Sequence, residues 1–178
     1  MSSQQRFFSN PAEPAEPSDW EIPLAIVTPT KTEQFLYTNA RSAAFDALLD
    51  ARLASEPWVK VNQNTLCLVQ YPASLLTRLE SAVRAKELPA LDRIQLVLDL
   101  KRLCNAQRVK PAQVLAFLRC YQAEDDWSVL EVVCSLLANV STFPPFEGSS
   151  SRISTKPTPT FAPNSSDSLV PCFHVSTF

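Results

Sequence analysis

The hydrophobic pattern of this 178-residue chain changes its period at Pro72. Before Pro72, apolar side chains recur at every second position in residues 20–28, which is the spacing of a half-buried strand. After Pro72, apolar side chains recur at three- and four-residue intervals, which is the spacing of helices. The sequence therefore predicts an α+β chain in which a strand-rich part, residues 1–71, precedes a helical part, residues 72–143.

The strand-rich part is expected to contain short, weakly specified strands. Pro23 cannot donate a ladder hydrogen bond, so the strand at residues 20–28 should lie at an edge or pair weakly there. Residues 35–37 could add a short strand. Residues 58–61 and 65–71 should form a hairpin, because the Asn-Gln-Asn between them suits a turn. Residues 43–54 instead have helix-forming composition, with three apolar side chains on one face: Phe45, Leu48 and Leu49.

The helical part is expected to contain four helices joined by short connections, as two antiparallel hairpins. Ser74 should cap the first helix, which runs to about residue 86, and the second covers residues 91–106. Pro111 suits the first turn of the third. Asp125 or Asp126 should cap the fourth, whose predicted inward face is Trp127, Leu130, Cys134 and Leu137.

The end of the chain has a different composition. Residues 144–178 are rich in Ser, Thr and Pro, carry four charged residues and have no apolar period. Such a segment cannot bury enough apolar surface to offset its conformational entropy. The sequence therefore predicts a disordered C-terminal tail.

The sequence offers few residues that could form a metal site. We therefore predict no catalytic residue, no cofactor-binding residue and no metal ligand. His174 is the single histidine, and the pair Cys172 and His174 is interpreted as coincidence. Three widely spaced cysteines on the predicted helices are interpreted as core residues: Cys104, Cys120 and Cys134. The five cysteines are expected to be reduced and mostly buried, in the cytoplasm, because no export signal precedes them. A net charge of −2 gives no reason to expect nucleic acid or a membrane as partner.

Several short motifs occur in an order that resembles the downstream half of the zinc aminopeptidases typified by puromycin-sensitive aminopeptidase and the endoplasmic reticulum aminopeptidases. They are Gln-Gln-Arg-Phe-Phe at residues 4–8, Trp-Glu-Ile-Pro-Leu at 20–24, Trp-Val-Lys-Val-Asn at 58–62, Tyr71, Asp92-Arg93 with Asp99-Leu100, and Trp127. The resemblance implies a partial β-sandwich followed by the start of an α-solenoid. It also implies strands rather than a helix at residues 43–54, and we give it the greater weight there because tertiary context overrides weak propensity.

The departures from the family pattern matter as much as the matches. The Gly-x-Met-Glu-Asn and His-Glu-x-x-His motifs, which bind substrate and zinc in the family, are absent. Gln107 stands where the family usually has the glycine that suits a left-handed helix end. Residues 65–68 are Thr-Leu-Cys-Leu, where relatives usually have glycine, two aromatic residues and arginine. A fragmentary gene model, a truncated isoform and a degenerate paralogue all fit this pattern.

The resemblance implies a non-catalytic fragment that would pack against a catalytic domain and help to close a peptide chamber. The alternative is an interaction module or regulator that binds a full-length aminopeptidase, and a third possibility is part of a larger enzyme. Peptide is a further expected partner. Self-association is expected because an unfinished helical array leaves apolar surface at its end. Arg93 and Asp99 are expected to pair with neighbouring helices or capping groups, with substrate contact as the alternative. Trp20, Trp58 and Trp127 are expected to anchor the core.

Overall fold

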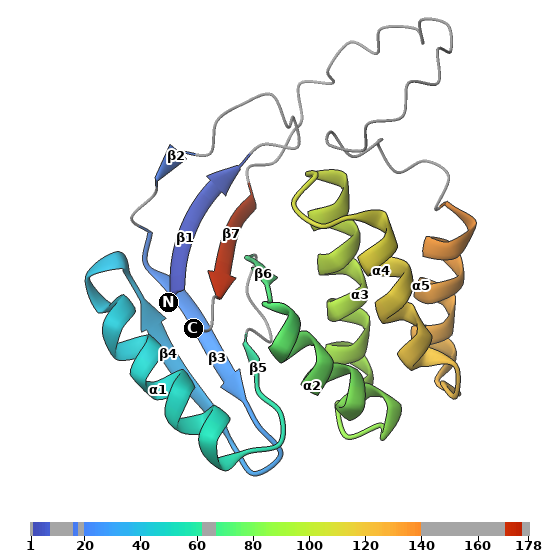
Figure 1. Ribbon diagram of the computed structural model, residues 1–178, viewed down its shortest axis with the longest axis horizontal. Coiled ribbons are helices and arrows are strands. Elements are labelled where there is room, and N and C mark those ends of the chain that lie inside the picture. Colours follow the sequence, from blue (N-terminus) through green and yellow to red (C-terminus); the bar gives the residue numbers. More distant parts are fainter. Residues whose placement is uncertain (1, 8–15, 18–19, 62–66, 140–169, 176–178) are drawn as a thin grey trace, which may run out of the picture.

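The computed structural model describes residues 2–7, 16–17, 20–61, 67–139 and 170–175, and the chain is of the α+β class, as predicted (Figure 1). The strands are β1 (Ser2–Phe7), β2 (Glu16–Pro17), β3 (Ile22–Val27), β4 (Thr32–Tyr37), β5 (Lys60–Val61), β6 (Leu68–Gln70) and β7 (Val170–Val175). The helices are α1 (Ser42–Ser55), α2 (Ala73–Arg84), α3 (Ala90–Asn105), α4 (Pro111–Leu118) and α5 (Trp127–Ala138). Short 3₁₀ turns, Asn39–Arg41 and Arg119–Tyr121, precede α1 and follow α4.

The described strands form two sheets. One has four strands in the order β2-β1-β7-β6, and the other has three in the order β4-β3-β5. The predicted hairpin of residues 58–61 and 65–71 is therefore wrong in its pairing, because β5 joins β3 while β6 joins β7. Its turn, residues 62–66, lies outside the described residues. Packing between distant segments decides which strands pair, and the composition of a turn contains no information about it.

The predicted disorder of residues 144–178 is wrong for Val170–Val175. These residues form β7, which pairs antiparallel with all six residues of β1 and parallel with β6. The average composition of the long Ser/Thr/Pro stretch does not reveal the short segment Val-Pro-Cys-Phe-His-Val. This segment pairs between β1 and β6, whose edges would otherwise lack a neighbour there. The rest of the predicted tail lies outside the described residues. The predicted domain boundaries, and the sandwich and solenoid, stay predictions.

The preference given to strands at residues 43–54 is wrong, because α1 occupies this segment. Phe45 and Leu49 lie one turn apart and are buried. Phe45 meets the rings of Phe35 and Tyr37 of β4 edge-on, with ring centroids 5.2 and 5.5 Å apart. Local helix propensity and the core on β4 therefore favour the same conformation.

Strand β3 separates two hydrophobic cores. Ile22, Leu24 and Ile26 belong to the core shared with α1, and Ala25 and Val27 belong to the core shared with the helices. Because side chains alternate along a strand, both faces of β3 are buried. Pro23 pairs with Leu36 of β4, whereas β5 reaches only the last two residues of β3. At Pro23, β3 therefore has one neighbour in its sheet, as the missing N–H predicted.

Helices α2 to α5 pack beside the strands, and α5 is the helix farthest from them (Figure 1). All four predicted helices are confirmed in existence and approximate extent. Asp126 caps α5 by accepting hydrogen bonds from the N–H groups of Ser128 and Val129, whereas Ser74 lies inside α2 and does not cap it. Lys86 and Gln107, after α2 and α3, have φ of 54° and 55°, so the left-handed position expected at Gln107 is confirmed.

The predicted inward face of α5 is wrong. Val129, Val133 and Leu136 are buried, whereas Trp127 is 78% exposed and Leu137 is 45% exposed. Trp58 is buried and Trp20 is half-buried, so the core role predicted for the tryptophans holds for these two. Apolar residues cover two neighbouring faces of α5, so its period alone could not decide which face packs on α3.

Candidate functional site

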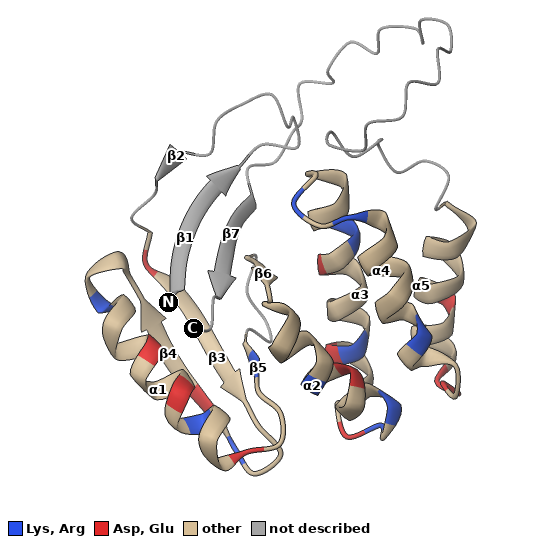
Figure 2. Cartoon of the chain, in the orientation of Figure 1, with Lys and Arg blue, Asp and Glu red and all other residues tan. Residues whose placement is uncertain are grey.

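A buried ion pair lies where the strands meet the helices. Lys60 of β5 is 1% exposed, and its Nζ lies 2.9 Å from Oδ1 of Asp92 of α3, which is 2% exposed. The same Nζ donates to Oε1 of Gln95 at 2.8 Å. Figure 2 shows β5 with a blue segment, between β3 and the helices. Burial lowers the pKa of Lys60, and the Asp92 carboxylate opposes that effect.

Alternation along β5 explains why a lysine is buried. Trp58 belongs to the core shared with the helices, and Val59 and Val61 belong to the core shared with α1. Lys60 lies two residues after Trp58 and therefore points toward the helices, where Asp92 meets it. Sequence reasoning did not identify Lys60. The sequence does indicate it in one way: Lys60 lies two residues after Trp58 in a predicted strand, so both side chains should point to the same face.

Asp99, two turns after Asp92 on α3, is the second buried carboxyl group at this boundary. Burial raises the pKa of Asp99 from 3.8 to about 7, and Lys60, Arg102 and the backbone N–H of Val69 oppose the rise. The nearby Tyr71 hydroxyl accepts from the Val61 N–H at 3.0 Å and donates to the Val61 carbonyl at 2.7 Å. Burial, followed by the charge of Asp99, raises the pKa of Tyr71 well above its ordinary value. These groups connect β5 and β6 with α3.

A second buried ion pair lies on the other side of α3. Arg93 donates from Nε and Nη2 to the two carboxylate oxygens of Glu124, at 2.8 and 3.0 Å. The Arg93 guanidinium also donates to the Leu88 carbonyl, and the Tyr121 hydroxyl donates to the Arg93 carbonyl at 2.8 Å. Burial raises the pKa of Glu124, but hydrogen bonds from the Asp126 N–H and from Arg93 outweigh it and lower the pKa overall. A bidentate pair of this kind fixes geometry as well as charge.

Helix α3 is therefore the central support of the described fold. Asp92 and Arg93 are consecutive, so they project about 100° apart around the helix. Asp92 binds β5, and Arg93 binds the connection that leads to α5. Arg93 pairs with Glu124 of the connection before α5, and the backbone N–H of Val69 in strand β6 donates a hydrogen bond to Asp99, so neither partner lies in a neighbouring helix as expected. The arrangement holds the strands and the helices together.

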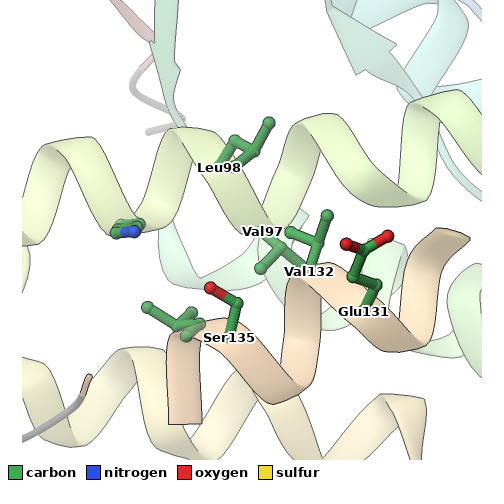
Figure 3. A pocket seen from close by; sticks show the side chains of 7 residues that line it. Val97, Leu98, Glu131, Val132 and Ser135 are labelled. Carbon is green, nitrogen blue, oxygen red and sulfur yellow. The ribbon is translucent and has the colours of Figure 1, made fainter. Parts of the chain in front are cut away.

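A cavity of about 300 Å³ lies between α3 and α5 (Figure 3). In Figure 3, Val97 and Leu98 project from one helix, and Val132, Glu131 and Ser135 project from the other. Lys101 and Leu136 complete the lining. The walls are mostly apolar, with one cation and one anion. A smaller cavity, about 130 Å³, lies where β6 meets α2, α3 and the segment before α4.

The cysteines of the described helices lie apart from one another and form no metal site. Across the described ranges, no group of three or more His, Cys, Asp and Glu side chains could hold a metal ion. Cys67, Cys104 and Cys120 are buried thiols outside any disulfide, and Cys134 is an exposed thiol, so the predicted core role is wrong for Cys134. Burial raises the pKa of Cys120 to about 12. Zinc of the aminopeptidase type does not fit this chain, because a single histidine cannot provide two imidazole ligands.

The chain is similar in sequence to proteins of a known family. Residues 58–148, which contain both buried ion pairs, match the family model of the ERAP1-like C-terminal domain. The chain belongs to this family. Within the ERAP1-like C-terminal domain, the matched segment begins at Trp58, so β5, β6 and helices α2 to α5 are the part that carries the likeness.

Three relatives are aminopeptidases by name. The chain is 28% identical over 131 residues to puromycin-sensitive aminopeptidase of Caenorhabditis elegans, which is 71% of this chain and 14% of that protein. It is 29% identical over 133 residues to aminopeptidase M1-A of Oryza sativa subsp. japonica, which is 71% of this chain and 15% of the relative. It is 32% identical over 85 residues to aminopeptidase M1-B of the same plant, or 47% of this chain and 10% of the relative. The chain thus spans a small part of each.

Among the described residues, no helix is long and apolar enough to cross a bilayer.

Proposed function

We propose that this chain is a non-catalytic module of the aminopeptidase type, which supports or encloses a peptide rather than cleaving it. The observation that carries the proposal is that the family match is to a C-terminal domain and spans residues 58–148. Cleavage by a zinc aminopeptidase requires several histidine and carboxylate ligands, and the sequence contains one histidine. In a longer protein, the module would pack against a catalytic domain and help to close the peptide chamber.

The buried ion pairs suit this role. A module that closes a chamber must keep its own shape while it contacts another domain. Lys60 with Asp92 ties β5 to α3, and Arg93 with Glu124 ties α3 to the chain just before α5. Pairs with little exposed surface hold one geometry, because loss of either partner leaves a buried charge. The free thiols of the described cysteines suit a cytoplasmic location, which we propose with this function.

The test is direct. The purified chain should hold no stoichiometric zinc after gel filtration and should release no amino acid from fluorogenic aminoacyl-amide substrates. A full-length puromycin-sensitive aminopeptidase, measured in parallel, is the positive control. One tightly bound zinc ion per chain, or turnover that follows the protein peak across the column, would refute the non-catalytic function.

The second candidate function is an interaction module or regulator that binds a full-length aminopeptidase. Two large side chains at the beginnings of α3 and α5, Leu91 and Trp127, are each 78% exposed and so leave apolar surface available to a partner. The chain should then change the kcat/KM of an added aminopeptidase in proportion to its concentration. No change at saturating chain concentration, with no co-migration on gel filtration, would remove this candidate.

A further inference from the structure

Strand β7 lies between two strands that come from distant parts of the sequence (Figure 1). All six of its residues pair antiparallel with β1, and residues 172–174 also pair parallel with β6. In the order β2-β1-β7-β6, β1 and β6 do not pair with each other, because β7 occupies the position between them. Residues 2–7 and 68–70 therefore form a gap that is one strand wide, which we call the strand slot.

The strand slot and β7 meet without a turn that joins them. β1 is the first described strand and β7 the last, the helices α2 to α5 lie between β6 and β7, and residues 140–169 separate β7 from the last described residue after α5. In a hairpin, a short turn fixes the register of two strands. No such turn fixes the register of β7, so its pairing with β1 and β6 resembles that of an extended peptide added to the sheet of another protein.

The positions along β7 differ in the number of strands that they pair with. Pro171 pairs with Arg6 of β1 and lies outside the pairing with β6. Phe173 pairs with Gln4 of β1 and with Val69 of β6. Proline has no N–H group to donate, so a strand tolerates it where there is one neighbour and not where there are two. The centre of the strand slot therefore requires a residue with an N–H group, and the flank does not.

The family match divides the strand slot from its occupant. β6 lies inside residues 58–148, which match the ERAP1-like C-terminal domain, and β7 lies outside them. A strand edge with unpaired N–H and C=O groups is a template for another strand. The edge that β6 presents is thus covered in this chain by a segment from outside the matched domain, which indicates that the edge accepts a strand from elsewhere.

We propose that the strand slot between β1 and β6 is a peptide-binding site, that β7 is its built-in occupant, and that an extended peptide pairs there when β7 leaves. The peptide runs antiparallel to β1 and parallel to β6, pairs over six residues, and tolerates proline at the position of Pro171 but not at that of Phe173. This inference rests on strand pairing and not on the proposed function. Because β7 is part of the same chain, it competes at an effective concentration of up to about 1 mM, and a micromolar peptide does not displace it.

Fluorescence anisotropy with a labelled synthetic peptide tests the proposal on the full chain. The probe has the sequence of residues 168–176 with serine in place of the cysteine. Phe173→Pro removes the N–H group at the centre of β7, and Phe173→Leu is the matched control that keeps it. The peptide should bind Phe173→Pro at least about tenfold more tightly than Phe173→Leu, because the slot of the control is already occupied. A second peptide, with proline also at the position of Phe173, should bind neither variant.

Hydrogen exchange measured by mass spectrometry follows the strand slot directly. Phe173→Pro should speed the exchange of the β1 and β6 amides at least about tenfold and leave the α3 amides protected, because local opening does not require the helices to unfold. Phe173→Leu should change neither. If Phe173→Pro also loses the protection of α3, the parent chain provides the test. The unlabelled peptide at about 5 mM, above the effective concentration of β7, should then speed the exchange of residues 170–175 and leave β1 protected.

Three outcomes would overturn the proposal. One is that β1 and β6 keep their protection in Phe173→Pro, because β7 would then not be what covers them. Another is that the peptide binds Phe173→Pro and Phe173→Leu equally, or binds neither of them. The third is that proline at the central position of the peptide does not weaken its binding, because such binding would not use main-chain pairing in the strand slot.

Discussion

Replacing Lys60 by Met should destabilise this protein far more than the same replacement at an exposed lysine. Lys60 pairs with Asp92 at 2.9 Å, and Lys86 pairs with Asp125 at 2.7 Å, so distance alone would predict similar effects. Burial separates the two pairs. The side chains of Lys60 and Asp92 are 1% and 2% exposed, whereas those of Lys86 and Asp125 are 35% and 80% exposed.

The magnitude follows from what remains after the substitution. Lys60→Met leaves the Asp92 carboxylate buried without its cation, and removing one member of a buried pair costs about 3–5 kcal/mol. That is a large fraction of the roughly 5–15 kcal/mol by which domains are stable. Loss of Lys60 also removes a charge that holds down the pKa of Asp99, so Asp99 should become harder to ionise. Lys86→Met removes a solvated pair and should barely change stability.

The assay is urea unfolding followed by far-UV circular dichroism at one fixed pH. With a slope of about 1–3 kcal/mol per molar urea, a loss of this size lowers the unfolding midpoint by roughly 1–5 M. The double variant Lys60→Met with Asp92→Leu removes the stranded charge and should recover much of the loss, since apolar replacements of buried pairs are often neutral.

Two results would refute this reasoning. Equal midpoints for Lys60→Met and Lys86→Met would mean that water reaches the Lys60 site and solvates Asp92. A double variant as unstable as Lys60→Met alone would mean that the lysine contributes through packing of its aliphatic stem rather than by pairing with Asp92.

Two further perturbations test the same structure. The pKa of Asp99 is raised from 3.8 to about 7, so its ionisation opposes folding. Its contribution to the free energy of unfolding should fall by about 3 kcal/mol from about pH 5 to about pH 8. Urea titrations should show this fall in the parent chain and not in Asp99→Asn, and an equal fall in both would contradict the assignment. Gln107→Gly should raise the free energy of unfolding by up to about 1 kcal/mol, because φ is 55° at Gln107 and glycine carries no Cβ there. The thermal midpoint should rise accordingly. Gln107→Ala is the control, and a gain from alanine as large as that from glycine would exclude the backbone explanation.

Features that depend on neighbouring residues along the chain were predicted from the sequence. The change of period at Pro72 separated strands from helices, and the extents of α2 to α5 followed from it. The Asp126 cap and the left-handed Gln107 were also predicted, because a cap involves hydrogen bonds within one or two turns. The family likeness added the link to aminopeptidases, which the match over residues 58–148 confirms.

Features that depend on which distant segments meet were decided by the tertiary structure. Local propensity allowed α1, but its packing on Phe35 and Tyr37 settled the choice. The separation of β5 from β6 and the insertion of β7 depend on strand partners far away in the sequence. The inner face of α5 is set by α3, because two neighbouring faces of the helix are apolar. Lys60 became a buried ion only when β5 met Asp92 of α3. In each case, the deciding energy is that of a contact between distant segments, which no local pattern contains.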